Sequence, residues 1–173
     1  MNWSAPASDL DPGTRFATRG RTVTEADVVG FAALTGDWHP QHADAVWAAE
    51  SPFGERIAHG MLVVSFAVGL VPLDPARVMA LRRIKDATFR RPVCLGDTIH
   101  VEGKVRERKT VNEEASLVVL GIDVVNQDGR RACGAQVEVL WREDVPAEDE
   151  LVAAAVTNGA AAAACGEDVW NLG

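Results

Sequence analysis

Hydrophobic and polar positions follow two different patterns in the two halves of the chain. Up to residue 73, apolar residues recur at helical spacing or fill a continuous run, whereas from residue 78 onward they often alternate with polar ones. Alternation of this kind, in stretches rich in Val, Ile, Leu and Thr, is typical of strands. The alternating stretches are residues 78–89, 98–108, 115–125 and 130–141. Turn residues such as Gly96, Asn112 and Gly129 separate them, which predicts one antiparallel sheet.

Helical signals precede the predicted strands. Thr24 is a favourable N-cap residue, and Asp27 three positions later gives a capping-box-like start. Helical spacing then continues to Gly36, a stop signal. A second, short helix is expected over residues 44–50, and residues 37–42 between the two are expected to form a loop.

Residues 60–73 form the most apolar stretch of the chain. They read GMLVVSFAVGLVPL, with Ser65 as the one polar side chain. A segment that is apolar all round predicts a helix buried on every side, and this one is shorter than the ~18 residues that a membrane span needs. Helices followed by a run of strands predict an α+β domain, with one antiparallel sheet packed on this central helix.

The 173 residues suit one domain with a tail. Residues 1–13 predict an irregular lead-in, and residues 14–142 predict the folded domain. Residues 143–173 hold seven acidic and no basic side chains, so the net charge of −8 lies almost wholly there. With eight alanines in 153–164 and few bulky residues, this tail is expected to be mobile. The alternative is a docked terminal helix anchored by Trp170. A chain ending after Val145 is expected to keep its fold and activity.

Composition excludes several classes of function. The acidic total offers no electrostatic footprint for nucleic acid, and neither a membrane span nor a signal peptide is expected. The three cysteines, Cys94, Cys133 and Cys165, are odd in number and widely separated, with no CxxC pair. This argues against a disulfide framework and a cysteine zinc site, and predicts a reducing, cytoplasmic location.

Candidate chemistry gathers in the predicted loop at 37–42. Asp37 and His42 form a carboxylate–imidazole pair, which can hold a water molecule and move protons near neutral pH. Pro40 pushes His39 toward an extended conformation. The alternatives are structural, with Asp37 as a helix cap and His42 as a packed or surface residue. A metal site is a further alternative, because Asp37, His39 and His42 are all competent ligands.

A second candidate site lies at the start of the apolar helix, in the stretch Ile57-Ala58-His59-Gly60-Met61-Leu62. The first N–H groups of a helix have no partner within it and lie at the positive end of its dipole. Gly60 has no side chain to block an approaching group, so a thioester carbonyl oxygen could be bound there and an enolate oxygen stabilised. The structural alternative is simply a glycine at a helix start.

A basic stretch lies on and just after the first long predicted strand. It consists of Arg82, Arg83, Lys85, Arg90 and Arg91. Such a stretch is either a solvated strand face or a contact for a ligand that carries phosphate, since arginine binds phosphate in a bidentate geometry.

The two candidate sites together resemble a known family. Gly36-Asp37-x-x-Pro40-x-His42-x-Asp44, followed by Phe53-Gly54-x-x-Ile57-Ala58-His59-Gly60-Met61-Leu62, resembles the MaoC-like (R)-specific enoyl-CoA hydratases. Phe89-x-x-Pro92-Val93-x-x-Gly96-Asp97 is also similar to that family, and the resemblance spans roughly residues 14–142. It implies a hot-dog fold, in which an antiparallel sheet wraps a long central helix, and it implies a homodimer.

The resemblance also implies a reaction and its residues. Members add or remove water across the 2,3 double bond of an acyl thioester, carried on coenzyme A or acyl carrier protein. Asp37 and His42 match the catalytic pair, and the backbone N–H of Gly60 matches the oxyanion donor, with no metal and no cofactor. We expect four residues to bind substrate: His59, Met61, Arg90 and Arg91, the arginines at its nucleotide end.

The chain departs from the commonest family pattern at His39, Gln41 and Val68, where Asn, an aliphatic residue and a serine are frequent. These changes leave the Asp–His pair intact but allow an altered substrate or reaction. The alternatives kept open are a hot-dog thioesterase and a non-catalytic binding or assembly subunit.

Overall fold

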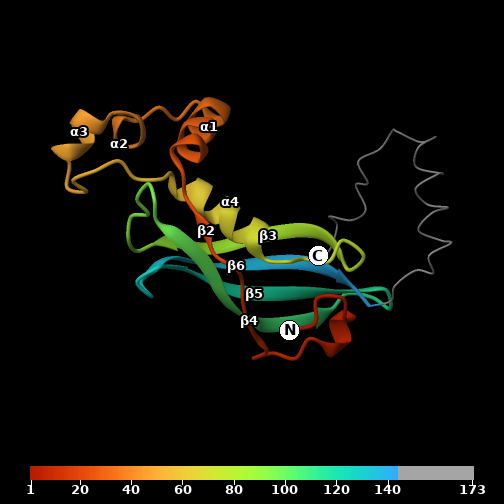
Figure 1. Cartoon of the computed structure of the whole chain (residues 1–173). Coiled ribbons are helices and arrows are strands. Elements are labelled where there is room, and N and C mark those ends of the chain that lie inside the picture. Colours follow the sequence, from red (N-terminus) through yellow and green to blue (C-terminus); the bar gives the residue numbers. More distant parts are fainter. Residues whose placement is uncertain (144–173) are drawn as a thin grey trace, which may run out of the picture.

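A six-stranded antiparallel sheet curves around helix α4 (Gly60–Leu70), as Figure 1 shows. The computed structural model describes residues 1–143. The strands are β1 (Arg15–Ala17), β2 (Arg21–Thr22), β3 (Val78–Phe89), β4 (Thr98–Thr110), β5 (Ala115–Asn126) and β6 (Arg131–Arg142). Their order is β1-β4-β5-β6-β3, and β2 also pairs with β4. The predicted α+β class with one antiparallel sheet is therefore confirmed.

The four long strands lie where the alternating pattern places them, and their ends differ from the prediction by two residues at most. Buried residues of β4, β5 and β6, such as Val101, Val118 and Val139, form one core with the inner face of α4. Gly129 turns the chain between β5 and β6 with φ 72°, a conformation that costs glycine little. In β4 the alternation matches burial, because alternate residues face this core, whereas β3 has no fully buried residue.

Helix α1 (Glu25–Thr35) begins with the predicted capping box. The Thr24 hydroxyl accepts from the Asp27 N–H, and the Asp27 carboxylate accepts from the Thr24 N–H at 2.8 Å. Helix α3 (Ala45–Ala49) lies within the predicted short helix. The expected loop at 37–42 is interrupted by α2 (Pro40–Ala43), because Pro40 is well suited to the first position of a helix.

Helix α4 differs from the expectation of burial on every side. Leu62, Val63, Val64 and Ala67 are buried, but Met61, Ser65 and Gly69 are exposed. These three residues recur every fourth position and so share one face of the helix. The sheet covers the opposite face only, which leaves this stripe open in the single chain. No helix in residues 1–143 is long and apolar enough to cross a membrane.

The irregular N-terminal segment packs into the core, around the short 3-10 helix η1 (Ala7–Asp9). Leu10 is fully buried, and the indole N–H of Trp141 donates to the Ala5 carbonyl at 3.0 Å. Figure 1 places this segment away from helices α1–α3, which gather beyond one end of α4. The tail from residue 144, with its predicted mobility, lies outside the described residues.

Cys94 and Cys133 are free thiols, and Cys165 lies outside the described residues. The cytoplasmic location stays a prediction.

Candidate active site

A pocket of about 640 Å³ opens at the N-terminal end of α4. It brings together the seven residues that the family resemblance assigned to catalysis or substrate binding. These are Asp37, His42, His59, Gly60, Met61, Arg90 and Arg91. Residues separated by more than 50 positions meet here because the segment carrying α1–α3 and the end of β3 both reach the start of α4.

Three chain segments form the frame of the pocket. Ile57 and Cys94 form an isolated antiparallel bridge, and the Ala58 N–H donates to the Val93 carbonyl at 2.8 Å. The Ile57 N–H in turn donates to the Gln41 carbonyl at 3.1 Å. Hydrogen bonds thus join the backbone around Ile57 to the segments on both sides of it. These bonds fix the positions of the pocket walls relative to one another.

His42, on α2, is 4% exposed and held in one tautomer. Its Nδ1 lies 2.7 Å from the Ile57 carbonyl oxygen, which can only accept, so Nδ1 carries the hydrogen. The lone pair is therefore on Nε2, which lies 3.0 Å from the amide nitrogen of Gln41. Burial lowers the pKa of His42 from its ordinary 6.5, although the Ile57 carbonyl opposes this shift. A neutral imidazole with its lone pair on Nε2 suits a proton acceptor.

His59 is the N-cap residue of α4 and is 2% exposed. Its Nε2–H donates to the backbone carbonyl of Asp37 at 2.9 Å. Its ring stacks on that of His42, with centroids 3.8 Å apart, and Phe31 packs against it at 5.0 Å. These contacts orient both members of the predicted pair. The lone pair on Nδ1 is buried without a partner among the described residues.

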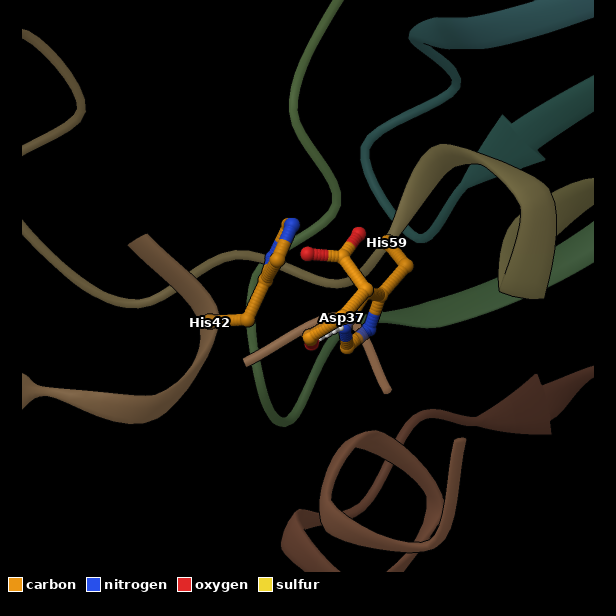
Figure 2. A group of neighbouring side chains, drawn as sticks. All are labelled: Asp37, His42 and His59. Carbon is orange, nitrogen blue, oxygen red and sulfur yellow. Dashed lines mark hydrogen bonds between the residues drawn. The ribbon is translucent and has the colours of Figure 1, made fainter. Parts of the chain in front are cut away.

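Asp37 follows α1 and directs its carboxylate toward the ring of His42, as Figure 2 shows. A carboxylate oxygen of Asp37 and one nitrogen from each of His42 and His59 lie within 4.8 Å of one another. No direct hydrogen bond joins the Asp37 carboxylate to His42 in residues 1–143. A single water molecule bridges groups at such a separation. The geometry therefore suits two groups that share one water.

His39 takes a different role from the one that the metal alternative gave it. Its Nδ1 accepts from the Gln41 N–H at 3.2 Å and caps α2, while its ring packs against Trp47. The group with metal-ligand spacing is instead Asp37, His42 and His59. The amide N–H of Gln41 occupies the lone pair that His42 would offer a cation, which weakens the metal alternative.

Gly60 is the first residue of α4, and no hydrogen bond within the described chain engages its N–H. The ring of Phe89 lies directly against it. A Cβ at position 60 would be 2.8 Å and 2.9 Å from two ring carbons of Phe89. Only glycine fits beside this ring without a shift.

The basic stretch divides into two parts. Arg82 pairs with Glu138 at 2.8 Å, and Arg83 and Lys85 lie 3.9 Å from the same carboxylate. This part is a strand-face ion network. Arg90 and Arg91 line the pocket instead, and Arg91 donates to the carbonyl of Arg131 at 3.0 Å.

Cysteine nucleophiles are disfavoured. Cys133 lines the pocket, but burial raises the pKa of its thiol. Burial also raises the pKa of Cys94 to about 11, with nearby Glu55 acting in the same direction. Few thiolates therefore form near neutral pH.

Three contributors to the site received no role from sequence reasoning: the Gln41 amide, the Phe89 ring and the Ile57 carbonyl. Gln41 and Phe89 lie within the motif stretches. The contact between Phe89 and Gly60, however, spans 29 positions of the sequence. The one available signal was Gln41 itself, a polar side chain next to His42 at a position where the family often has an aliphatic residue.

Comparison with known proteins shows the family. Residues 9–126 match the model of the MaoC like domain, so the chain belongs to the MaoC-like family. The chain is 43% identical over 109 residues to protein MaoC of Klebsiella aerogenes, which covers 62% of this chain and 32% of that protein. It is 38% identical over 102 residues to the 3-hydroxybutyryl-CoA dehydratase of Methylorubrum extorquens. This match covers 57% of this chain and 62% of that enzyme. The chain thus spans less than two thirds of both relatives.

A shorter relative is covered more fully. The chain is 33% identical over 124 residues to the (R)-specific enoyl-CoA hydratase of Rhodospirillum rubrum, covering 68% of this chain and 83% of that enzyme. Among solved structures, a monoamine oxidase regulatory protein from Archaeoglobus superposes with a TM-score of 0.76 at 36% identity. The superposition covers 83% of this chain and 99% of that one. A Mycobacterium tuberculosis protein described as a double hot-dog fold superposes with a TM-score of 0.72 at 20% identity. This superposition covers 83% of this chain and 46% of that one. The chain therefore has the predicted hot-dog fold.

Proposed function

We propose that this protein is a hydro-lyase that adds water to the 2,3 double bond of an acyl thioester, or removes it from the 3-hydroxyacyl thioester. The observation that carries the proposal is the convergence of the Asp37 carboxylate, the His42 Nε2 and the Gly60 N–H on one pocket. A hydration needs one proton acceptor, one proton donor and one donor for the carbonyl oxygen, and these three groups supply them. Relatives named as enoyl-CoA hydratase and 3-hydroxybutyryl-CoA dehydratase support it.

The groups act together in the hydration direction. Asp37 and His42 hold one water between them, and its oxygen forms a bond to C3 while one of the pair takes a proton. Electrons of the double bond move toward the thioester carbonyl, whose oxygen is stabilised by the Gly60 N–H at the positive end of α4. C2 then receives the proton that the pair took from the water, and the 3-hydroxyacyl thioester is complete. No step requires a metal or an organic cofactor.

An assay with crotonyl-CoA tests the reaction directly. Loss of the enoyl absorbance supports a hydratase, whereas release of free coenzyme A thiol without hydration would indicate a thioesterase. Asp37→Asn and His42→Ala should each lower kcat by about 10²- to 10⁴-fold. The double variant should be little worse than the poorer single one, because the pair acts on one water. Inactivation by EDTA with recovery on adding zinc would favour the metal alternative.

The substrate is proposed to be an acyl thioester of a phosphate-bearing carrier, such as coenzyme A. Arg90 and Arg91 line the pocket and are exposed, which suits contacts with phosphates. Arg90→Ala should raise KM for the coenzyme A ester more than it lowers kcat. Arg83→Ala is the matched control, because Arg83 lies on the strand face near Glu138. An equal effect on KM in both variants would contradict this assignment.

The proposed assembly is a homodimer in which the β3 strands of two copies meet. Within residues 1–143, β3 pairs with β6 alone, and its other edge is unpaired. Met79, Leu81 and Ile84 are exposed along it. An open strand edge with apolar side chains is a liability unless covered. Light scattering at micromolar concentration should give twice the chain mass, and a monomer would exclude the dimer.

A further inference from the structure

Gln41 carries a side-chain contact that the proposed reaction has to accommodate. Its amide nitrogen lies 3.0 Å from Nε2 of His42, and the residue lines the pocket. An amide nitrogen only donates, and the Ile57 carbonyl opposite Nδ1 only accepts. Both contacts therefore require the same tautomer, in which Gln41 donates to the Nε2 lone pair.

That lone pair cannot serve two donors at once. A neutral imidazole nitrogen has a single lone pair in the plane of its ring. The water shared with Asp37 and the Gln41 amide therefore compete for Nε2. When Nε2 takes up a proton it becomes a donor, and the amide nitrogen facing it has no lone pair to accept that hydrogen.

Two hydrogen bonds hold the backbone of Gln41 in place. Its N–H is held by His39 Nδ1 at 3.2 Å, and its carbonyl is held by the Ile57 N–H at 3.1 Å. The side-chain torsions remain, and the terminal amide torsion has a broad, roughly two-fold energy profile. Half a turn of the amide exchanges its N–H groups for its oxygen at the same place.

We propose that Gln41 is a positioning residue for His42: its amide N–H holds Nε2 of the neutral ring, and its amide oxygen accepts from that nitrogen once the ring is protonated. The inference rests on the proposed function for its role in turnover. The contact itself does not depend on the substrate. Gln41 thereby supports the histidine in both of its protonation states.

Other charged or titratable groups also face His42, and they stay unchanged when Gln41 is replaced. Asp37 and His39 approach from the segment before α2, and His59 approaches from the start of α4. Arg90 and Arg91 line the same pocket. A change in the titration of His42 that follows a substitution at Gln41 is therefore attributable to the amide.

Two variants separate this role from simple space filling. Gln41→Glu places a carboxylate opposite Nε2, which repels the lone pair of the neutral ring and accepts from the protonated ring. The pKa of His42, followed by NMR of its ring protons, should rise by about one unit or more. Gln41→Met has a similar length but no donor or acceptor. Its kcat should fall about two- to tenfold, the weight of one hydrogen bond, with little change in KM.

The same substitutions at Gln136 are the matched controls. Gln136 lies on β6, outside the pocket, and its amide donates to Asp86 at 2.8 Å. Gln136→Glu adds the same charge to the protein and should leave the titration of His42 unchanged, since distant surface charges are screened.

The inference is overturned if His42 in Gln41→Glu titrates as in the unmodified chain, or if Gln41→Met keeps full kcat. Should Gln41→Glu fail to fold, as judged by circular dichroism, the kcat of Gln41→Met decides alone. If the unmodified chain hydrates no enoyl thioester, the proposed function fails, and the NMR titration still decides whether Gln41 acts on His42.

Discussion

Replacing Gly60 with alanine tests the proposed oxyanion donor through a steric effect that the structure defines. The added Cβ would stand 2.8 Å, 2.9 Å and 3.2 Å from three carbons of the Phe89 ring. Carbon atoms in favourable contact lie about 3.5–4.0 Å apart, so the ring or the helix start has to move by roughly half an ångström or more. Phe89 is half exposed, which lets the ring yield. The cost in stability should therefore be near 1 kcal/mol, the low end for overpacking.

The cost in activity should be much larger. A displaced ring enters the space in front of the Gly60 N–H, and loss of one preorganised oxyanion donor lowers kcat by about 10²- to 10³-fold. We would measure kcat for crotonyl-CoA together with the thermal midpoint. The matched control is Gly69→Ala at the other end of α4, where an added Cβ meets no atom within 4 Å. That variant should keep its kcat and gain about 0.5–1 kcal/mol from helix propensity.

The double variant Gly60→Ala with Phe89→Leu distinguishes the two effects. A smaller, flexible side chain at 89 makes room for the methyl group, so stability should recover. Activity should recover in part if the N–H is again accessible. The reasoning is refuted if Gly60→Ala retains full kcat, or if Gly69→Ala loses as much activity as Gly60→Ala.

Three further predictions concern other contacts. His59→Ala removes both the hydrogen bond to the Asp37 carbonyl and the stack on His42, so kcat should fall about tenfold or more with a smaller change in KM; a change in KM alone would make His59 a substrate contact. Burial lowers the pKa of His42 below its ordinary 6.5, so the unfolded chain binds that proton at higher pH than the folded chain. The free energy of unfolding, measured in urea, should therefore fall as the pH drops through about 6.5 and level off below the lowered pKa; His42→Gln should lack this dependence, and parallel curves for the two proteins would contradict the assignment. Arg77→Met removes hydrogen bonds to the Ser4 and Glu143 carbonyls and should lower the free energy of unfolding by about 1–3 kcal/mol with kcat unchanged; unchanged urea stability would show that the N-terminal segment is held without it.

Local rules in the sequence account for the elements of this fold. The capping box at Thr24 and Asp27 acts within one turn of helix, so it is visible in the sequence and present in the structure. The alternation in β3 to β6 locates the strands to within two residues, and in β4 it follows from alternate residues facing the core. The motif around Asp37, His42 and Gly60 likewise named residues that meet in one pocket.

Tertiary structure decided everything that depends on contacts between distant segments. The sequence could not show that Gln41 occupies the lone pair of His42, since that depends on the Ile57 carbonyl fixing the tautomer from 15 positions away. Nor could the sequence distinguish the arginines that form ion pairs on the sheet from those that line the pocket. Glu138 on the neighbouring strand β6 pairs with Arg82, whereas Arg90 lines the pocket.

The central helix illustrates the same limit. Its composition predicted burial all round, but apolar content reports only which surfaces can be buried. Which of them are buried depends on how far the sheet extends around the helix, and in this chain it leaves Met61, Ser65 and Gly69 open. The periodicity of side chains is a local property of the sequence, so it determines where the helices and strands lie. The site depends on packing between elements, which only the folded chain determines.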